Sequence, residues 1–487
     1  MQLDPETCYR AMVSRDRRFE GRFVVAVRST GIYCRPGCPA KTPHKRNVHF
    51  YAHAAAAEQA GFRPCLRCRP ESAPGTPAWL GTSATVARAL RLIVDGEFAD
   101  GERGERDQRG VEALAARLGI GARHLTRLFA EHVGVAPGAV ARTRRVHFAR
   151  KLLDETDLPM AEVALAAGFS SVRRFNEAMR QTFRRAPTEL RRSRANPRGS
   201  SLRLKLPYRA PLDWPAFRAF LGARSVAGVE TFDGDVWRRA VAVDGWSGVV
   251  SVAPLASPRG ESALELTLDG PPPRALLPIV ERVTRVFDLD ADPRVIGDEL
   301  ARDPILRPLV RARPGLRVPG AWDGFELAVR AILGQQISVA RATALAAKLV
   351  AACGAPLDAG HGLTRLFPTA AEVARADVAA LGMPRARARS IVALAEAVAR
   401  GDLTLARGRD LDETTAALTA LPGIGPWTAQ YIAMRALGEP DAFPSSDLGI
   451  RHALARAGLS TASEIERRAE RWRPWRAYAA MQLWMGT

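Results

Sequence analysis

The spacing of hydrophobic residues divides the chain into two helical stretches and one β-rich stretch. Residues 83–190, and the chain from residue 286 to its end, place apolar residues at the three- and four-residue spacing of amphipathic helices. Residues 201–285 differ, because they contain alternating or β-branched segments that predict strands, with one short helix. These segments are 202–206, 237–243 and 263–268, and the helix is expected near 215–221.

Two segments rich in Pro, Gly and small polar residues separate these stretches. Residues 69–82 read RPESAPGTPAWLGT and residues 191–200 read RRSRANPRGS, as linkers do. A length of 487 residues is itself enough for several domains. We therefore predict a multidomain α+β protein, divided into residues 1–76, 83–192, 201–285 and 286–487.

Residues 111–132 and 160–183 resemble one another, and each predicts two helices joined by a tight turn. In the first repeat, Ala115 lets the helices approach and Gly119, four residues later, supplies a positive-φ turn. A connecting helix is expected at 137–153. One such hairpin would mean little, since an amphipathic bundle with solvated arginines also fits.

Two hairpins in tandem carry a family resemblance. The second, GFSSVRRFNEAMRQTFRRAPTELR, resembles the AraC-type DNA-binding domain. The resemblance implies that exposed positions on two recognition helices contact DNA, where Arg and Asn suit guanine and adenine edges. The candidate DNA-binding residues are Arg123 and Arg127 in the first repeat, and Arg173, Arg174 and Asn176 in the second.

The composition excludes wholesale disorder and a membrane protein. The chain is 47% hydrophobic and 25% charged, which provides apolar material for several cores. No apolar run approaches the ~18 residues that span a bilayer. The first residues, MQLDPETCYR, lack the basic-then-apolar pattern of a signal peptide, which predicts a cytoplasmic protein with no membrane partner.

The charge is strongly positive. Lys and Arg number 71 against 51 for Asp and Glu, a formal net charge of +20, and only five of the 71 are Lys. Because guanidinium groups pair with phosphate in a bidentate way, an Arg surplus of this size suggests a polyanionic partner. The alternative is a compositional bias towards Arg on solvated surfaces.

Four of the six cysteines fall within one short stretch. Cys34 and Cys38 form a C-x3-C pair, and Cys65 and Cys68 follow after a gap of 26 residues as a C-x2-C pair. Two such pairs can converge on one tetrahedral ion, so the spacing predicts a four-thiolate Zn²⁺ site. Four unligated thiols in a reducing compartment are the weaker alternative.

The stretch RFEGRFVVAVRSTGIYCRPGCPAKTPHKRNVHFY, followed by AGFRPCLRCRP, resembles the N-terminal domain of the Ada family. The resemblance implies that Cys34 irreversibly accepts a methyl group from a methylphosphotriester in DNA. Zinc keeps thiols deprotonated, and four thiolates carry excess charge that leaves their sulfurs nucleophilic. Methylation would remove one negative charge and so weaken repulsion from DNA. A purely structural zinc finger remains open.

A tight hairpin and a spaced acid stand in the C-terminal part. In TALPGIGPWTAQY, Gly423 and Gly425 allow backbone amides to approach a phosphate oxygen closely. Asp447 follows 22 residues after Gly425, within DAFPSSDLGIRHAL. Alone, an Asp after two Ser residues would be read as a helix N-cap.

Together these motifs resemble the helix-hairpin-helix DNA glycosylases. Further matches, RPGLRVPGAWDGFELAVRAILGQQISVA, LGMPRARA and ERWRPWRAYAAMQLW, narrow the resemblance to the AlkA branch from about residue 205 onwards. It implies excision of alkylated purines of the 3-methyladenine type, with the carboxylate of Asp447 stabilising an oxocarbenium-like sugar or activating water. The β-rich residues 201–285 would be that branch's TBP-like α+β domain, before an all-α glycosylase domain.

The resemblance also assigns a base pocket. A lyase of this superfamily carries a Schiff-base Lys where this chain has Trp427, and no Lys follows Lys348, so the enzyme is expected to be monofunctional. Trp427, Tyr431 and Trp484 match aromatic pocket positions that attract cationic bases, although the first two could equally be core residues. The family's apolar wedge is replaced by Gln336.

Two functional hypotheses follow. The first is a DNA repair glycosylase, fused to an Ada-type half made of a small four-cysteine zinc domain and an all-α tandem helix-turn-helix domain. The alternative is a methylation-responsive transcription regulator whose glycosylase half is inactive or minor. In both, a monomer binds double-stranded DNA and one Zn²⁺, and the hairpin resemblance adds a monovalent cation.

Overall fold

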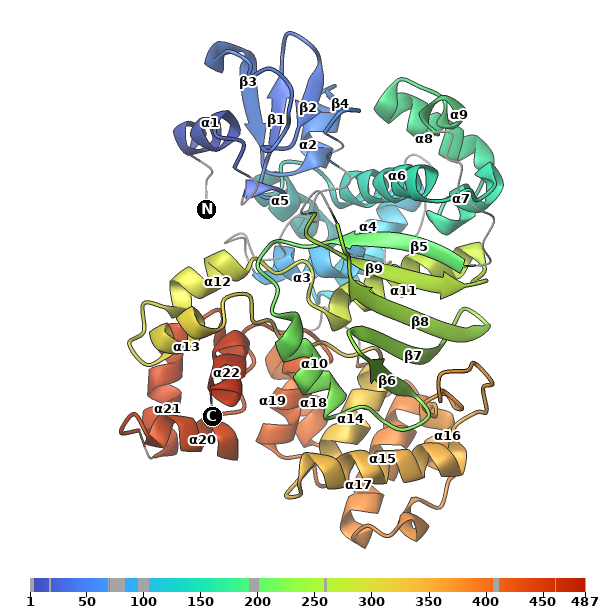
Figure 1. The fold of residues 1–487 in the computed structure, drawn as a ribbon, viewed down its shortest axis with the longest axis vertical. Helices are drawn as coiled ribbons and strands as arrows, with labels where there is room; N and C mark the ends of the chain where they lie inside the picture. The colour runs from blue at the N-terminus through green and yellow to red at the C-terminus, as the bar shows by residue number, and fades with distance from the viewer. Residues whose placement is uncertain are drawn as a thin grey trace. The chain divides into compact units, whose positions relative to one another are not determined.

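The computed structural model describes residues 4–16, 19–68, 70, 84–94, 105–191, 201–257, 261–405, 411–459 and 461–486 (Figure 1). Most of both predicted linkers lies outside these residues. Chain contacts define two units. The first comprises Met1–Arg209, Ser257–Glu281 and Leu289–Ala291, and the second Ala210–Ala256, Arg282–Asp288 and Asp292–Thr487. No helix in the described ranges has the length and apolar character that crossing a membrane requires.

The first unit begins with helix α1 and a four-stranded sheet of order β3-β1-β2-β4. Strand β1 pairs antiparallel with β2 and β3, and β2 pairs parallel with β4, with Tyr33 opposite Pro64. This register brings the end of β2 beside the loop that follows β4. The elements are α1 (Pro5–Val13), β1 (Val24–Val27), β2 (Ile32–Cys34), β3 (Val48–Tyr51), α2 (Ala54–Gln59) and β4 (Arg63–Pro64).

Both faces of this sheet are covered. Side chains of α1, including Cys8 and Met12, pack with Phe23 and Val25 on one face, whereas Tyr33 and Ala57 lie in the core on the other. Helix α2 also contributes to the core of the helices that follow, through its alanines at 55 and 56. The sheet and those helices therefore share buried apolar surface.

Both predicted helix-turn-helix repeats are present in the first unit. Gly119 and Gly168 adopt φ values of 68° and 78°, as their turns require, and α6 begins at Pro137 as predicted. Each recognition helix, α5 and α8, buries one apolar stripe. The helices are α3 (Ala84–Val94), α4 (Glu105–Arg117), α5 (Ala122–His132), α6 (Pro137–Glu155), α7 (Met160–Ala166), α8 (Val172–Phe183) and α9 (Pro187–Leu190).

The predicted strands of residues 201–285 are also present. In the first unit, β5 (Ser201–Pro207) pairs antiparallel with β9 (Ala263–Asp269). In the second unit, α10 (Trp214–Gly222) precedes an antiparallel meander of β6 (Glu230–Asp233), β7 (Val236–Val243) and β8 (Trp246–Pro254). Helix α11 (Pro273–Val286) continues the chain from residues of the first unit into residues of the second.

The rest of the second unit is helical, and α14 lies at its centre, almost wholly buried and packed against α17 and α19. Helices α18 and α19 form the predicted hairpin, and α20 packs on α22. The helices are α12 (Pro293–Leu300), α13 (Leu306–Ala312), α14 (Gly324–Leu333), α15 (Val339–Cys353), α16 (Ala370–Arg375), α17 (Arg385–Ala399), α18 (Leu411–Thr419), α19 (Pro426–Arg435), α20 (Leu448–Ala455), α21 (Ala462–Ala469) and α22 (Arg476–Met485).

Three buried charged residues and the partly buried Arg330 join the meander to α14. Glu230 accepts hydrogen bonds from Arg239 at 3.0 Å and from Arg330 at 2.8 Å, and Glu326 pairs with the same two guanidinium groups. Two positive and two negative groups balance, which is the condition for burying ions without a large penalty. The network fixes α14, which leads directly into the loop that carries Gln336.

Candidate functional sites

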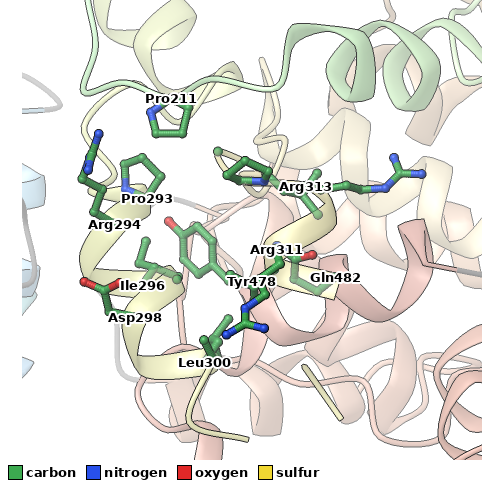
Figure 2. A pocket seen from close by; sticks show the side chains of 16 residues that line it. Pro211, Pro293, Arg294, Ile296, Asp298, Leu300, Arg311, Arg313, Tyr478 and Gln482 are labelled. Atoms are coloured by element: carbon green, nitrogen blue, oxygen red, sulfur yellow. The ribbon is translucent and has the colours of Figure 1, made fainter. Parts of the chain in front are cut away.

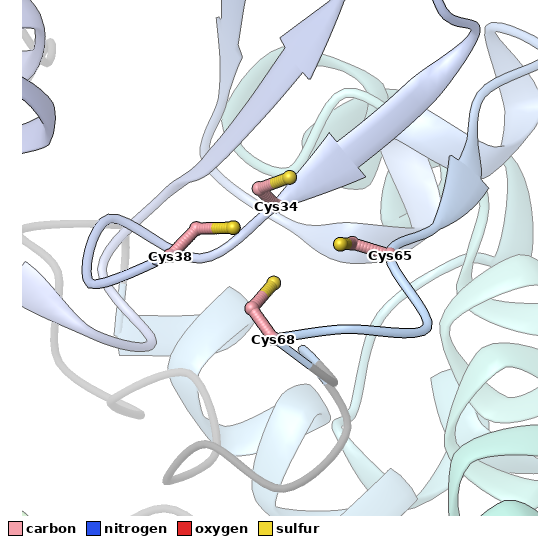
Figure 3. Close-up of side chains that lie close together, drawn as sticks. All are labelled: Cys34, Cys38, Cys65 and Cys68. Atoms are coloured by element: carbon pink, nitrogen blue, oxygen red, sulfur yellow. The ribbon is translucent and has the colours of Figure 1, made fainter. Parts of the chain in front are cut away.

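The four cysteines converge as the sequence predicts. Cys34 ends β2, Cys38 lies in the turn after it, and Cys65 and Cys68 follow β4, so that all four Sγ atoms lie within 4.8 Å of one another (Figure 3). Their side chains point towards a common centre. Four thiolates at these separations suit tetrahedral Zn²⁺.

Two basic side chains close to the cysteines in sequence form ion pairs with glutamates. Arg35 donates to Glu20 at 3.1 Å, and Lys45 pairs with Glu6. Hydrogen bonding from Cys34 lowers the pKa of the Cys38 thiol to about 7. The pair with Glu20 partly neutralises the charge of Arg35, which directly follows the predicted methyl acceptor in sequence.

Tyr33, immediately before Cys34, belongs to a buried polar network that the sequence did not indicate. Its hydroxyl donates to Glu58 Oε1 at 2.8 Å and lies 3.1 Å from His147 Nε2. Thr143 donates to the other oxygen of Glu58 at 2.7 Å. Burial alone would raise the pKa of Glu58, but the hydrogen bonds from His147, Thr143 and Tyr33 lower it. Helix α6 is thereby tied to the strand that ends in Cys34.

The recognition helices present their predicted residues differently. Arg123 and Arg127 on α5 are exposed, and Arg127 lies 3.0 Å from His124 Nδ1. On α8, Arg173 is exposed, whereas Arg174, which donates to Ser170 at 2.9 Å, and Asn176 are partly buried. The exposed positions on both helices are therefore accessible to a DNA groove.

Asp447 is held by two tryptophans as well as by its own helix. Trp427 donates its indole N–H to Oδ2 at 2.9 Å, and Trp484 donates to Oδ1 at 2.8 Å. The backbone N–H of Ile450 donates to Oδ1 at 3.1 Å, which makes Asp447 the N-cap of α20. Asp447 is therefore both the N-cap of α20 and a carboxylate whose two oxygens are oriented by neighbouring N–H donors.

The three predicted aromatic residues surround this carboxylate. Trp427 and Tyr431 stack with ring centroids 5.5 Å apart and planes 14° apart, and Trp484 lies 6.1 Å from Tyr431. Gly449 makes room, since a Cβ there would lie 3.2 Å from Trp484 Cδ1. All three aromatic residues are only partly buried, so they are not simply a packed core, and together they are called the aromatic niche below.

The polar end of Tyr431 contacts guanidinium groups that sequence reasoning missed. Arg435 donates to the Tyr431 hydroxyl at 2.8 Å, and Arg224 also hydrogen-bonds it. Burial would raise the pKa of this phenol, but the charges of Arg435 and Arg224 lower it. The spacing of Tyr431 and Arg435, four apart on one helix, is the signal that could have indicated the first contact.

The hairpin between α18 and α19 has the geometry that its glycines predict. Gly423 adopts a φ of 75°, and a Cβ on it would lie 2.1 Å from Ser390 Oγ, so only glycine fits. Gly425 is the N-cap of α19, where the helix N-terminus presents unpaired N–H groups. Such an end favours a phosphate oxygen.

Gln336 lies exposed in the loop between α14 and α15 with a left-handed φ of 57°. Strained backbone of this kind is common at functional positions. Two large apolar side chains that sequence reasoning missed are also exposed. Val339, three residues after Gln336, is 40% exposed, and Leu448, directly after Asp447, is 65% exposed. Exposed apolar groups at such a site suit contact with unstacked bases.

A cavity of about 470 Å³ lies elsewhere in the second unit, lined by α12, α13 and α22 (Figure 2). Tyr478 and Gln482 line it from α22, and Tyr478 donates to Asp288 at 2.7 Å. Trp484 comes two residues after Gln482, roughly 200° around the helix. None of the predicted site residues lines this cavity.

Comparisons with known families match four consecutive regions of the chain. They are the metal binding domain of Ada at residues 7–71, a helix-turn-helix domain at 114–193, the AlkA N-terminal domain at 203–323, and the HhH-GPD superfamily base excision DNA repair protein at 329–477. The family resemblances drawn from the sequence are thereby confirmed.

Individual relatives resemble the whole chain or a large part of it. A probable bifunctional transcriptional activator/DNA repair enzyme AlkA of Mycobacterium tuberculosis is 45% identical, over 99% of this chain and 97% of its own length. DNA-3-methyladenine glycosylase 2 of Escherichia coli is 37% identical over 57% of this chain and 95% of its own. Among solved structures, a 3-methyladenine DNA glycosylase from Archaeoglobus fulgidus superposes with a TM-score of 0.50 and 26% identity, covering 58% of this chain and 97% of that one.

Proposed function

Because the chain belongs to the family of bifunctional transcriptional activator/DNA repair enzymes of the AlkA type, we propose that Asp447 is the residue with which it excises alkylated purines from DNA. The observation that carries this proposal is the carboxylate held between the indoles of Trp427 and Trp484. The chain is a DNA-3-methyladenine glycosylase fused to an Ada-type, DNA-binding regulatory half.

The chemistry follows from the surroundings of Asp447. An alkylated purine leaves with the electron pair of its C1′–N bond, and positive charge develops on the sugar. An ionised carboxylate stabilises that charge and accepts a proton from the water whose oxygen then bonds to C1′. Because Trp427 occupies the position of a Schiff-base Lys, the reaction ends with free base and an abasic site.

The aromatic niche supplies affinity for the base. A purine with an added alkyl group is cationic or electron-poor, so the faces of Trp427 and Tyr431 attract it. The base must leave the helix to reach the niche, and in this proposal Gln336 fills the gap that it leaves. The amides beside Gly423 and Gly425 hold a phosphate, and carbonyls of the same hairpin hold a monovalent cation.

The Ada-type half acts as the sensor in this proposal. Cys34, Cys38, Cys65 and Cys68 hold one Zn²⁺, which keeps the thiols ionised, and Cys34 accepts a methyl group from a methylphosphotriester. Arg123, Arg127, Arg173, Arg174 and Asn176 contact promoter DNA. We propose a division at residues 1–76, 83–192, 201–285 and 286–487, which agrees with the order of the four family matches, although the AlkA N-terminal match extends to residue 323. We take the protein to act as a monomer on chromosomal DNA.

A base-release assay tests the enzymatic proposal. The full chain, incubated with methylated duplex DNA, should release 3-methyladenine, and Asp447→Asn should lower the rate by at least about a hundredfold. The Asn side chain keeps the N-cap and one acceptor for an indole, so the fold is preserved. Full activity in this variant would disprove the role of Asp447.

Mass spectrometry tests the sensor. After incubation with DNA that contains methylphosphotriesters, the chain should gain one methyl group, on Cys34. If no cysteine gains mass while the base-release assay is positive, the chain is a glycosylase with a structural zinc finger. The reverse result would favour the regulator with an inactive glycosylase half.

A further inference from the structure

Gln335, next to Gln336, joins two loops that come from distant parts of the chain. Its side-chain Nε2 donates to the carbonyl oxygen of Gly423 at 2.9 Å and to Thr428 Oγ1 at 2.9 Å. The first partner lies in the turn of the hairpin and the second in the first turn of α19. Both N–H groups of the amide are therefore used on the element that holds the phosphate.

Helix α17 supports the same junction from a second side. Arg387 donates to the backbone carbonyl of Gln335 at 2.5 Å, and Ser390, one turn later on the same face, contacts Gly423. Residue 335 is thus held through both its side chain and its backbone. Consecutive Cα atoms are about 3.8 Å apart, so fixing the backbone of Gln335 also fixes where the side chain of Gln336 begins.

We propose that Gln335 is a positioning residue for base flipping, which holds Gln336 at a set distance from the phosphate-binding hairpin. The inference rests on the proposed roles of the hairpin and of Gln336. When the hairpin grips the backbone beside a damaged base, Gln335 places Gln336 at the base stack. Excision depends on this alignment even though Gln335 contacts neither the damaged base nor Asp447.

The chemistry of the amide makes the role specific. An ionised carboxylate has the same shape but accepts hydrogen bonds only. A carboxylate at position 335 would have no N–H to donate to the Gly423 carbonyl, and its negative charge would repel the carbonyl oxygen. Gln335→Glu therefore breaks the link between the loops with almost no change in volume, whereas hairpin and wedge residues stay as they are.

The first experiment isolates flipping from chemistry. The full chain carrying Asp447→Asn is mixed with a duplex that contains 2-aminopurine beside a methylated purine. The fluorescence of 2-aminopurine should increase on binding, because the methylated purine next to it leaves the stack. Adding Gln335→Glu should reduce this increase about tenfold. The Kd for undamaged duplex, from fluorescence anisotropy, should change by less than the flipping signal does, because phosphate contacts elsewhere on the chain also support it.

The outcomes distinguish the positioning role of Gln335 from the proposed functions on which it rests. Unchanged fluorescence with Gln335→Glu overturns the proposal, and so does an equal loss of fluorescence and of duplex affinity, because then the hairpin itself has been lost. A flipping signal that survives Gln336→Ala would show instead that the wedge assignment is wrong. Absence of base release by the parent chain would refute the enzymatic proposal.

A matched pair at the acceptor provides a second test that does not alter Gln335. Thr428→Ser keeps the hydroxyl that accepts from Gln335, and Thr428→Val removes it with little change in size. The single-turnover excision rate should be kept by the Ser variant and lowered by the Val variant, and the Val substitution should add little to Gln335→Glu. Equal rates for the two Thr428 variants would contradict the link.

Discussion

Cys34 and Asp447 are the proposed reactive residues of the two halves, and they are held in opposite ways. Cys34 stands among three groups of its own kind, whose sulfurs lie within 4.8 Å and whose charges repel unless a cation binds. Asp447 stands among neutral donors, two indole N–H groups and one backbone N–H. The first site needs a cation to offset that repulsion, whereas the second is held by hydrogen bonds from the chain itself.

The difference bears on how each group is used. A thiolate in a cluster of four carries excess charge that makes it nucleophilic, and a covalent change at one sulfur alters the whole cluster. A carboxylate fixed by neutral donors keeps its orientation from one turnover to the next. The first arrangement suits a single irreversible event and the second suits repeated catalysis.

The largest expected effect comes from removing the metal. Cys65→Ser should abolish the single zinc per chain and unfold the four-stranded sheet, since a structural zinc contributes on the order of 10 kcal/mol. Metal analysis and hydrogen exchange of residues 19–68 measure both. Base release should stay within about twofold of the parent, because Asp447 depends on no ion. A parallel loss of excision would break the contrast.

Removing one indole donor should have the next largest effect. Trp484→Phe keeps an aromatic ring near Tyr431 but leaves Asp447 Oδ1 without its 2.8 Å partner. The single-turnover excision rate should fall by about a hundredfold, as when one preorganised donor is lost. Trp322→Phe, at a buried tryptophan outside the niche, is the control. Equal rates for the two variants would show that the indole N–H is not needed.

A smaller effect is expected beside the cysteine cluster. Tyr33→Phe removes the hydroxyl that donates to Glu58, and should lower the free energy of unfolding of the first unit by about 1–2 kcal/mol. Urea unfolding of the zinc-loaded protein measures this, and zinc content should remain one per chain. Zinc loss in this variant would mean that Tyr33 supports the thiolates directly.

The smallest effect concerns pH. Burial lowers the pKa of His53 from 6.5 to about 4, so between these values the unfolded chain binds a proton that the folded chain does not. Stability should therefore fall as the pH is lowered from 7 towards 4. His53→Asn keeps an acceptor for the N–H of Ala55 and should flatten the Tm profile between pH 7 and 5. An unchanged slope would contradict this assignment.

Local sequence patterns were sufficient to predict the helices, the strands and the convergence of the four cysteines. Strand alternation, the Gly119 and Gly168 turns and the hairpin of Gly423 depend on neighbours in sequence, and the structure places each where expected. The cysteine spacing predicted convergence because two short pairs on adjacent loops have few other arrangements. The aromatic residues around Asp447 came from family resemblance, not from periodicity.

The remaining contacts could not be predicted because they join distant segments through side-chain orientation. Nothing in the sequence places Glu58 between Tyr33 and His147, which lies 89 residues further on. Spacing likewise cannot show that Trp427 turns its N–H towards Asp447. Gln335 was overlooked because its neighbour matched the wedge position, and only its contact with Gly423 distinguishes the two glutamines.

The buried link through Glu58 has a consequence for how this protein can change over generations. Its carboxylate belongs to the zinc-binding region, but two of its partners, Thr143 and His147, belong to the helix between the DNA-reading repeats. Exchanging either region alone by recombination would separate this buried carboxylate from Thr143 and His147 and leave it with Tyr33. We therefore expect the two regions to be inherited as a pair, with substitutions at these positions accepted together.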